Sequence, residues 1–139
     1  MSNIDWSKVE PAKTTEQLCA EARSAAVSRN NFAYNVATHL ITADYPQLEK
    51  DTWPTQDKEI KAYQADPENA LTPWIDTAAT VRGLERIDYI NRTIAKVALF
   101  EQVSAYLTGL RQKYEDQIKA ATSVAAVEAL TFTYSIPGG

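Results

Sequence analysis

The sequence predicts an all-α domain of three to four helices, with one long C-terminal helix over about residues 86–121, plus a short C-terminal β-strand. Apolar residues recur every three or four positions through most of the chain, which is the spacing of one helix face. Glycine is scarce, with 4 in 139 residues, and this argues against a loop-rich fold. We expect three parts: an N-terminal arm over 1–13, a helical domain over 14–130, and a C-terminal strand or tail over 131–139.

The first helix is expected to begin after Thr14, because Thr14 and Gln17 have the spacing of a capping box. It should end before Pro46, which disfavours helical dihedrals in the preceding residue. Asn30 and Asn31 are weak helix formers, and we expect a break or kink there if the helix has one. The residues predicted to share its apolar face are Leu18, Ala22, Ala25, Phe32, Val36, Leu40 and Ile41.

Two shorter helices should follow. The second is expected to begin near Pro54, with the proline in its first turn, and to run to about Ala65. The third has a strong start signal, with Thr72 as N-cap and Pro73 at the first helical position. Gly83 is placed to end it through a left-handed C-cap.

The long helix is predicted from apolar residues that step by three or four over nine turns. At 1.5 Å per residue such a helix is roughly 50 Å long. It must bury its apolar face against the other helices or a second copy of the chain, so self-association is plausible. The residues of this face are Ile87, Ile90, Ile94, Val97, Phe100, Val103, Leu107, Leu110, Tyr114 and Ile118.

After a short turn capped by Thr122 or Ser123, the apolar period changes from helical spacing to two. Leu130, Phe132, Tyr134 and Ile136 alternate with Thr131, Thr133 and Ser135, which is typical of a strand. A lone strand must satisfy its backbone groups. It could pair with the arm around Ile4 and Trp6, add to a sheet edge in another protein, or remain a disordered tail.

The sequence offers no credible catalytic or metal-binding constellation. His39 is the single histidine, and Cys19 is the single cysteine. One histidine beside an apolar helix face supplies neither a hydrolytic triad nor a set of metal ligands. Neighbouring acids such as Glu115 and Asp116 are interpreted as solvated helix faces. We therefore expect no enzyme activity, no cofactor and no metal.

Charge and hydropathy exclude two further classes of partner. The net charge is −4 and the basic residues form no block, so we expect no nucleic-acid binding. The apolar runs are too short to span a bilayer, and the first residues lack the features of a signal peptide. The isolated cysteine fits a reducing cytoplasm.

Aromatic residues exceed what a three-helix core needs. Most should lie in the core, but tryptophan and tyrosine dominate protein interfaces, because they bury a large area and keep a polar group. Trp53 and Trp74, near helix starts, are the better interface candidates. The residues predicted to bind a partner are Trp53, Tyr63, Trp74, Tyr106, Arg111, Phe132, Tyr134 and Ile136.

From about Tyr45 to Ala121 the sequence resembles a known family. The likeness is carried, in order, by Trp53-Pro54-Thr55-Gln56, Glu59, Tyr63, Asp66, Thr72-Pro73, Ile75-Asp76, Arg82-Gly83, Lys96, Phe100, Gly109, Arg111-Gln112, Ile118 and Ala120-Ala121, and the opening Ile4-Asp5-Trp6-Ser7 is also similar. The family is the helical domain of unknown function found in tailed-phage tail-fibre assembly proteins. One departure is that tyrosine stands at position 63 where tryptophan is more common. We also expect the chain to differ from many longer members in having no separate N-terminal module.

The resemblance implies a chaperone without catalytic residues, which holds a phage tail-fibre or receptor-binding protein in the host cell cytoplasm while it folds or attaches. It also implies a hypothesis for residues 131–136, which could cover a fibre edge by β-augmentation. Deleting the residues after Leu130 should then weaken the complex. The alternatives are a small structural tail or baseplate protein, or a phage-encoded inhibitor that binds a host protein.

Overall fold

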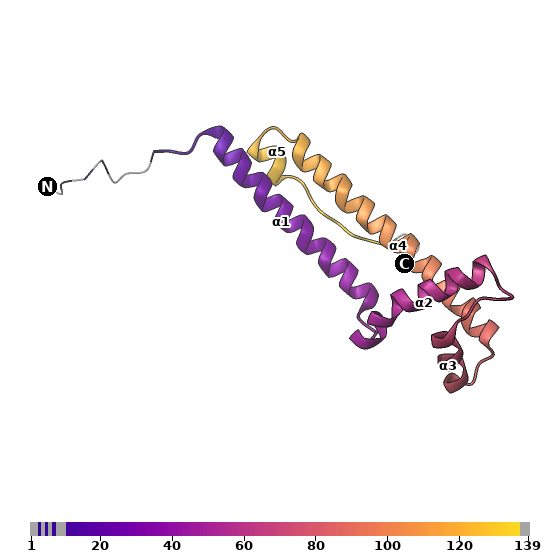
Figure 1. Ribbon diagram of the computed structural model, residues 1–139. Helices are drawn as coiled ribbons and strands as arrows, with labels where there is room; N and C mark the ends of the chain where they lie inside the picture. The colour runs from indigo at the N-terminus through magenta and orange to yellow at the C-terminus, as the bar shows by residue number, and fades with distance from the viewer. Residues whose placement is uncertain (1–2, 4, 6, 8–10, 137–139) are drawn as a thin grey trace.

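The computed structural model describes residues 3, 5, 7 and 11–136, and this part of the chain is helical (Figure 1). Two long helices, α1 and α4, lie side by side, α2 and α3 form a small lobe at one end, and α5 lies at the other end. The helices are α1 (Thr15–Thr42), α2 (Gln47–Ala65), α3 (Pro73–Arg82), α4 (Arg86–Ala120) and α5 (Val124–Glu128). The predicted all-α class is confirmed for the described residues. The proposed arm residues Ile4, Trp6 and Val9 lie outside them.

Helix α1 begins as the sequence predicts and runs without a break. The Thr14 hydroxyl accepts a hydrogen bond from the Gln17 backbone N–H, and the Gln17 side chain accepts one from the Thr14 N–H. Asn30, where the sequence suggests a possible break or kink, is instead buried and contacts α4. Its side-chain nitrogen donates to the backbone carbonyl of Arg111, 3.1 Å away in α4, and this bond compensates for low helix propensity.

The predicted apolar face of α1 is correct for Ala22, which packs in the core, and wrong for its larger residues Leu18, Phe32, Val36 and Leu40, which are exposed. The buried face consists of small residues, among them Cys19 and Ala26, with Ala22 packed against them. The larger residues Phe32 and Leu40 are 71% and 69% exposed. Small side chains let two helix backbones approach closely, so α1 packs through its small residues and leaves its large ones outside.

Helix α2 begins at Gln47, earlier than the start expected just before Pro54, and Pro54 lies inside it rather than in its first turn. Pro46 is the N-cap, with a φ of −58°, so one proline both follows the end of α1 and starts α2. The predicted end near Ala65 is confirmed.

Helix α3 has the predicted bounds but a different cap. Thr72 is the N-cap residue, yet its side chain does not bind the free N–H groups of the first turn. The Glu59 carboxylate of α2 does so, accepting from the backbone N–H of Trp74 at 3.1 Å and of Ile75 at 3.0 Å. Gly83 ends the helix with a φ of +79°, as its position predicts.

The long helix is confirmed, and α4 supplies residues to two separate cores. At the α2–α3 end, Ile90 packs with Ile60 and Ile75. At the α5 end, Ile118 packs with Val127 and with the small residues of α1. The predicted short turn after Ser123 is α5, capped by the Ser123 hydroxyl, which accepts from the Ala126 N–H at 3.1 Å.

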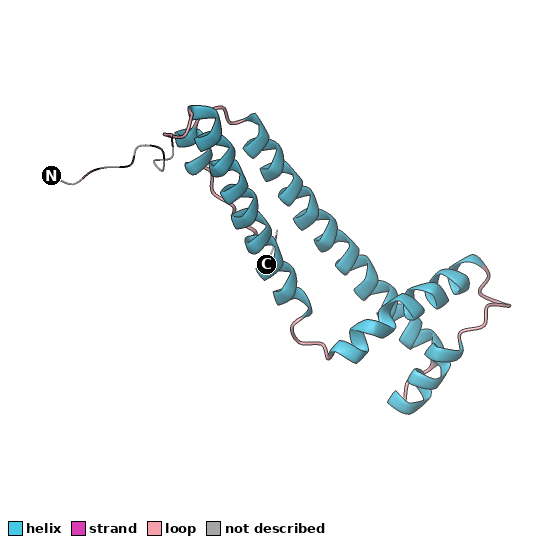
Figure 2. Cartoon of the chain, turned by 60° about the vertical axis from the view of Figure 1, so that its left-hand side comes forward, coloured by secondary structure: helices cyan, strands magenta, loops and turns pink. Residues whose placement is uncertain are grey.

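The predicted C-terminal strand is wrong. Residues 130–136 are extended but have no strand partner among the described residues (Figure 2). The alternation itself is real, because Phe132 and Tyr134 are partly buried while Thr131 and Thr133 are exposed. The inward side chains contact helices α1 and α4 instead of a neighbouring strand, and a period of two does not distinguish these two surroundings.

Candidate protein-binding surface

The C-terminal segment, residues 130–136, is held in the groove between α1 and α4. The hydroxyl of Tyr134 donates a hydrogen bond to the side-chain oxygen of Asn30. Its ring makes edge contacts with Tyr34 and Tyr114, with centroids 5.9 and 5.5 Å away. Burial, and to a smaller extent the neighbouring Tyr114, raises the pKa of Tyr134, so its phenol stays protonated and remains a donor.

Tyr114 also binds the backbone of this segment. Its hydroxyl donates to the Thr133 carbonyl at 2.7 Å and accepts from the Thr133 N–H at 3.3 Å. Phe132 lies against the Tyr114 ring, with centroids 5.4 Å apart, and the Arg29 guanidinium of α1 lies 5.7 Å from the Phe132 centroid. One tyrosine therefore satisfies both backbone groups of an extended residue that has no strand beside it.

Arg111, a predicted partner-binding residue, is engaged within the chain. Its Nε donates to the Asn31 side-chain oxygen at 3.0 Å, and an Nη lies 3.3 Å from the Glu115 carboxylate. The bond to Asn31 ties α4 to α1, and the ion pair with Glu115, within α4, holds the guanidinium in place. The predicted role of Arg111 in partner binding stays a prediction.

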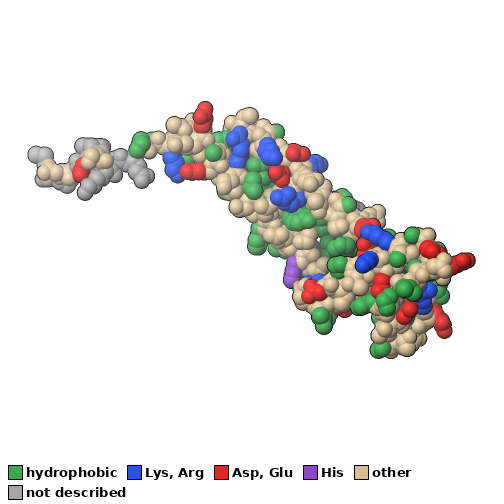
Figure 3. All heavy atoms as spheres, in the orientation of Figure 1, with side chains coloured by type: hydrophobic (Ala, Val, Ile, Leu, Met, Phe, Trp, Pro, Cys, Tyr) green, Lys and Arg blue, Asp and Glu red, His purple; other side chains and the backbone are tan. Residues whose placement is uncertain are grey.

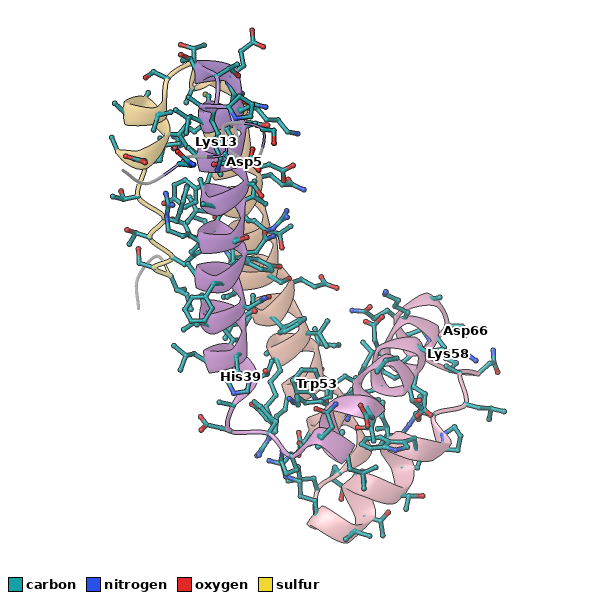
Figure 4. All side chains as sticks on the ribbon, turned by 90° about the vertical axis from the view of Figure 1, so that its left-hand side faces the viewer. Asp5, Lys13, His39, Trp53, Lys58 and Asp66 are labelled. Carbon is teal, nitrogen blue, oxygen red and sulfur yellow. The ribbon has the colours of Figure 1, made fainter. Side chains whose placement is uncertain are left out.

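Trp53 lies where α2 passes α4, close to the C-terminal end of α1 that carries His39 (Figure 4). Its ring makes edge contacts with Tyr45 at 5.3 Å and with Phe100 at 5.7 Å. Trp53 is partly buried, whereas Phe100 remains 42% exposed. This aromatic group joins the small lobe to the long hairpin of α1 and α4.

Trp74 and Tyr63 surround the core of the small lobe. Trp74 contacts Tyr89 at 6.3 Å, and the Arg86 guanidinium lies 5.3 Å from the centroid of Tyr63. Trp74 and Tyr63, which were both predicted to bind a partner, pack against Ile60, Ile75 and Ile90. The structure thus brings five of the eight candidates, Trp53, Tyr63, Trp74, Phe132 and Tyr134, into ring contacts within the chain.

The other two candidates remain accessible. Tyr106 is 41% exposed in the middle of α4, and Ile136 is 40% exposed at the end of the C-terminal segment. Tyr106 does not stand alone, because it continues a row of apolar side chains on α4.

Apolar residues line the middle of both long helices, and we call this surface the α1–α4 apolar face. On α1, positions 32, 36 and 40 are spaced by one helical turn, and on α4, positions 99, 103, 106 and 110 have spacings of four, three and four. Leu99 is 62% exposed. Figure 3 shows hydrophobic side chains at the surface of both the long hairpin and the small lobe. The face consists of Phe32, Val36, Leu40, Leu99, Val103, Tyr106 and Leu110.

The two rows do not face the same direction. On α4, Tyr114, which contacts the C-terminal segment, stands four residues after Leu110, so the α4 row lies on the side that holds the segment. On α1, Phe32 stands two residues from both Asn30 and Tyr34, which contact α4 and the segment, so at 100° per residue it points away from them. The α1 row therefore lies on the outer surface of its helix.

The charged residues near this face are basic. Between positions 29 and 40 of α1 there is no Asp or Glu, and Arg29 is the charged residue. Between positions 96 and 113 of α4 the bases are Lys96, Arg111 and Lys113, and the one acid is Glu101. Glu101 lies about 200° around the helix from Leu99 at 100° per residue, so it points away from the apolar row.

A hollow of about 380 Å³ lies on the α1 part of this face, lined by Phe32, Asn35, Val36, His39 and Leu40. His39 thus borders an apolar surface and has no group of acids or sulfur ligands around it. Within the described residues, no three or more His, Cys, Asp or Glu side chains gather in a way that could hold a metal ion. No helix of the described chain is long and apolar enough to cross a membrane.

Six residues of the α1–α4 apolar face were not among the predicted binding residues: Phe32, Val36, Leu40, Leu99, Val103 and Leu110. The sequence does carry their signal, because α1 has two rows at helical spacing, one of large residues and one of alanines. The larger row was assigned to the core on the ordinary expectation that bulky apolar residues are buried.

A comparison with protein families finds a similarity over part of the chain. The model of the HI1402 helical domain matches residues 95–131, which span about the last three quarters of α4, α5 and the start of the C-terminal segment. The match overlaps the Ile94 to Ala121 stretch and covers less than half of the chain. Its description names no phage or fibre, and no curated protein and no solved structure matches the chain.

Proposed function

We propose that this chain is a non-catalytic protein-binding domain that acts as an assembly chaperone for a phage tail-fibre or receptor-binding protein in the host cytoplasm. The α1–α4 apolar face is the observation that carries the binding part of this proposal. Phe32, Leu40 and Leu99 are each more than 60% exposed on the two long helices. Large contiguous apolar patches on a soluble domain usually mark a binding surface.

The identity of the client comes from the resemblance to tail-fibre assembly proteins. Phage fibres are long, β-rich trimers, and before assembly their strand edges and apolar tips are exposed and prone to aggregate. A helical partner with an apolar face could cover such a surface, and it needs no active site to do so. Tyr106, 41% exposed within the face, is the predicted binding residue that fits this role most directly.

Co-expression with a phage tail-fibre polypeptide tests the proposal. The wild-type chain should bind the fibre polypeptide and raise its yield as soluble trimer. The double variant Phe32→Asp/Leu99→Asp should lower that yield at least tenfold, because each aspartate puts a charge into the contact. Leu71→Asp is the matched control, since Leu71 is 85% exposed and lies outside the face. A fibre that trimerises equally well without the chain would refute the chaperone function.

Analysis of purified particles separates the chaperone from a structural tail or baseplate protein. A chaperone leaves the fibre after assembly, so the chain should be absent from mature virions. Its presence at a fixed copy number would favour the structural alternative. Binding to a host protein in cells without the fibre gene would favour the inhibitor.

A further inference from the structure

We propose that the outer side of α4 pairs with the same side of a second copy of this chain, as two antiparallel helices related by a two-fold axis near residue 104. The outer side is the one turned away from α1, and between the small lobe and α5 no other described helix covers it in Figures 1 and 2. This inference goes beyond the proposed function, because it concerns the assembly of the chain and does not depend on the identity of the client.

Helix α4 has two different sides. Ile90, Thr93, Leu107 and Ile118 are buried on the side that faces the rest of the chain. On the other side, a second row of residues repeats at alternating spacings of three and four, which is the heptad pattern of a helix pair. We call this row the α4 seam, and all of its residues are exposed: Arg92, Ala95, Leu99, Gln102, Tyr106, Gly109, Lys113 and Asp116.

The middle of the α4 seam carries no charge. Leu99, 62% exposed, and Tyr106, 41% exposed, alternate with the smaller or uncharged Ala95, Gln102 and Gly109. The solvent side of a surface helix ordinarily holds charged residues, whereas the centre of a protein interface is depleted of them and enriched in aromatic side chains. The composition of the seam is therefore typical of an interface.

An antiparallel pair places large side chains of one copy against small residues of the other. The two-fold axis makes each residue face the one that stands equally far on the other side of residue 104. Leu99 then lies opposite Gly109 of the second copy, five residues from the axis in each case, and Tyr106 lies opposite Gln102. A Cβ added at Gly109 meets nothing within 4 Å, so the space beside it is open to a leucine from outside. Large residues packed into such gaps bring two helices into close contact.

The charged ends of the α4 seam are complementary in the same register. Arg92 and Asp116 are exposed, and neither forms an ion pair within the part of the chain that the structure describes. They stand 24 residues apart, about 36 Å along α4, so they cannot meet within one copy. Each is twelve residues from residue 104, so Arg92 of one copy faces Asp116 of the other at both ends of the pair.

This complementarity selects a second copy in the antiparallel direction. A parallel pair would place Arg92 against Arg92 and Asp116 against Asp116, and it would stack Leu99 on Leu99 instead of on Gly109. Lys113 lies opposite Ala95 in the antiparallel pair, where its long side chain can pass a small residue and reach water. The helix is also preformed, because two separate cores hold its inner side, and a preorganised surface loses little freedom on binding.

Sedimentation equilibrium of the full chain, at micromolar to millimolar concentration, tests the interface. The wild-type chain should form a dimer, and Gly109→Leu should raise its dissociation constant at least tenfold, because the new side chain takes the place of Leu99 from the second copy. The single chain tolerates this change, since position 109 is open and leucine favours a helix more than glycine does. Ser24→Leu, at an exposed position of α1, is the matched control and should stay within twofold of wild type.

Charge reversal tests the register. Arg92→Asp and Asp116→Arg should each weaken the dimer about tenfold, because each puts two contacts between like charges into the pair. The double variant Arg92→Asp/Asp116→Arg restores opposite charges and should return to within threefold of wild type. Lys58→Asp, which reverses an exposed base of α2, is the control and should stay within twofold.

Four results would overturn the inference. A wild-type chain that stays monomeric at millimolar concentration has no such interface. A dimer that Gly109→Leu leaves intact uses another surface. Single charge reversals that weaken the dimer without rescue in the double variant exclude the antiparallel register. A monomer that loses fibre binding through Gly109→Leu assigns the seam to the client.

Discussion

The hydroxyl of Tyr134 donates a hydrogen bond to the side-chain oxygen of Asn30, a residue 104 positions earlier in the chain. Asn30 is 2% exposed in the middle of α1, and its amide nitrogen donates to the Arg111 carbonyl of α4. One buried amide thus joins the two long helices and the C-terminal segment. Buried polar groups are stable when each of their hydrogen-bonding atoms has a partner, as both do here.

Replacing Tyr134 with phenylalanine should remove that bond while keeping the ring contacts. The Asn30 oxygen would then be buried without its partner, so we expect the free energy of unfolding to fall by about 1–3 kcal/mol. Urea denaturation measures the change, and hydrogen exchange should show faster opening of residues 130–136. Tyr106→Phe, on the exposed face, is the control and should change stability by less than about 0.5 kcal/mol. Equal losses in both variants would contradict this account.

The same contact should make stability depend on alkaline pH. Burial raises the pKa of Tyr134 above its ordinary value of 10.0, and Arg111 opposes this only in part. A raised pKa means that the folded state favours the protonated phenol, so this contribution is complete below about pH 10 and is lost as pH rises through the folded pKa. The stability difference between wild type and Tyr134→Phe, measured from pH 8 to 11, should shrink above pH 10. Burial also raises the pKa of Tyr89, but Tyr89 is present in both proteins, so its effect cancels from the stability difference. A constant difference would rule the mechanism out.

Glu59 should contribute to stability through the cap of a helix to which it does not belong. Its two carboxylate oxygens accept from the N–H groups of Trp74 and Ile75, so Glu59→Ala should lower the free energy of unfolding by about 1–2 kcal/mol. Glu59→Gln retains one acceptor oxygen and should lose less. Thermal denaturation compares them with Glu68→Gln, which changes an exposed acid beyond the end of α2. A larger loss of stability in Glu59→Gln than in Glu59→Ala would disprove the capping role.

Two glycines should respond to alanine in opposite directions. At Gly83 the φ of +79° is unfavourable for alanine although an added Cβ meets nothing within 4 Å, so we expect a loss of about 1–2 kcal/mol. Gly109 lies in the interior of α4, also with open space around it, so alanine should stabilise the protein by about 0.5–1 kcal/mol. Chemical denaturation of Gly83→Ala and Gly109→Ala reports both values. A gain at Gly83 would be inconsistent with the left-handed cap.

Local signals in the sequence predicted most helix bounds. The capping box at Thr14, the Thr72-Pro73 start, Gly83 as the C-cap and the extent of the long helix α4 all correspond to observed features. Two residues of the predicted apolar row of α4, Ile87 and Phe100, are exposed. These signals concern neighbouring residues, and their physical causes act within one or two turns. The start of α2 was missed because Pro46 and Pro54 both carry the same start signal.

Features that depend on distant partners were not predictable in the same way. The large residues of α1 were expected in the core, but α4 packs against the alanine row, so Phe32 and Leu40 are exposed. The alternation at Phe132 and Tyr134 predicted a strand, but their neighbours are helices. In both cases the apolar residues do recur at the predicted spacing, but the spacing alone does not determine which element packs against them.

The position of α4 across both cores has a consequence for how the molecule opens. Ile90 and Ile118 belong to different clusters and stand about 42 Å apart along one helix, at 1.5 Å per residue. Each cluster can lose its packing while the helix between them remains formed, so the two ends form separate cooperative units of unfolding. Amide exchange should therefore occur at two rates, one for α2 and α3 and one for α1, α5 and the C-terminal segment. A client bound to the middle of α1 and α4 would protect the second group of amides and leave the small lobe free to fluctuate.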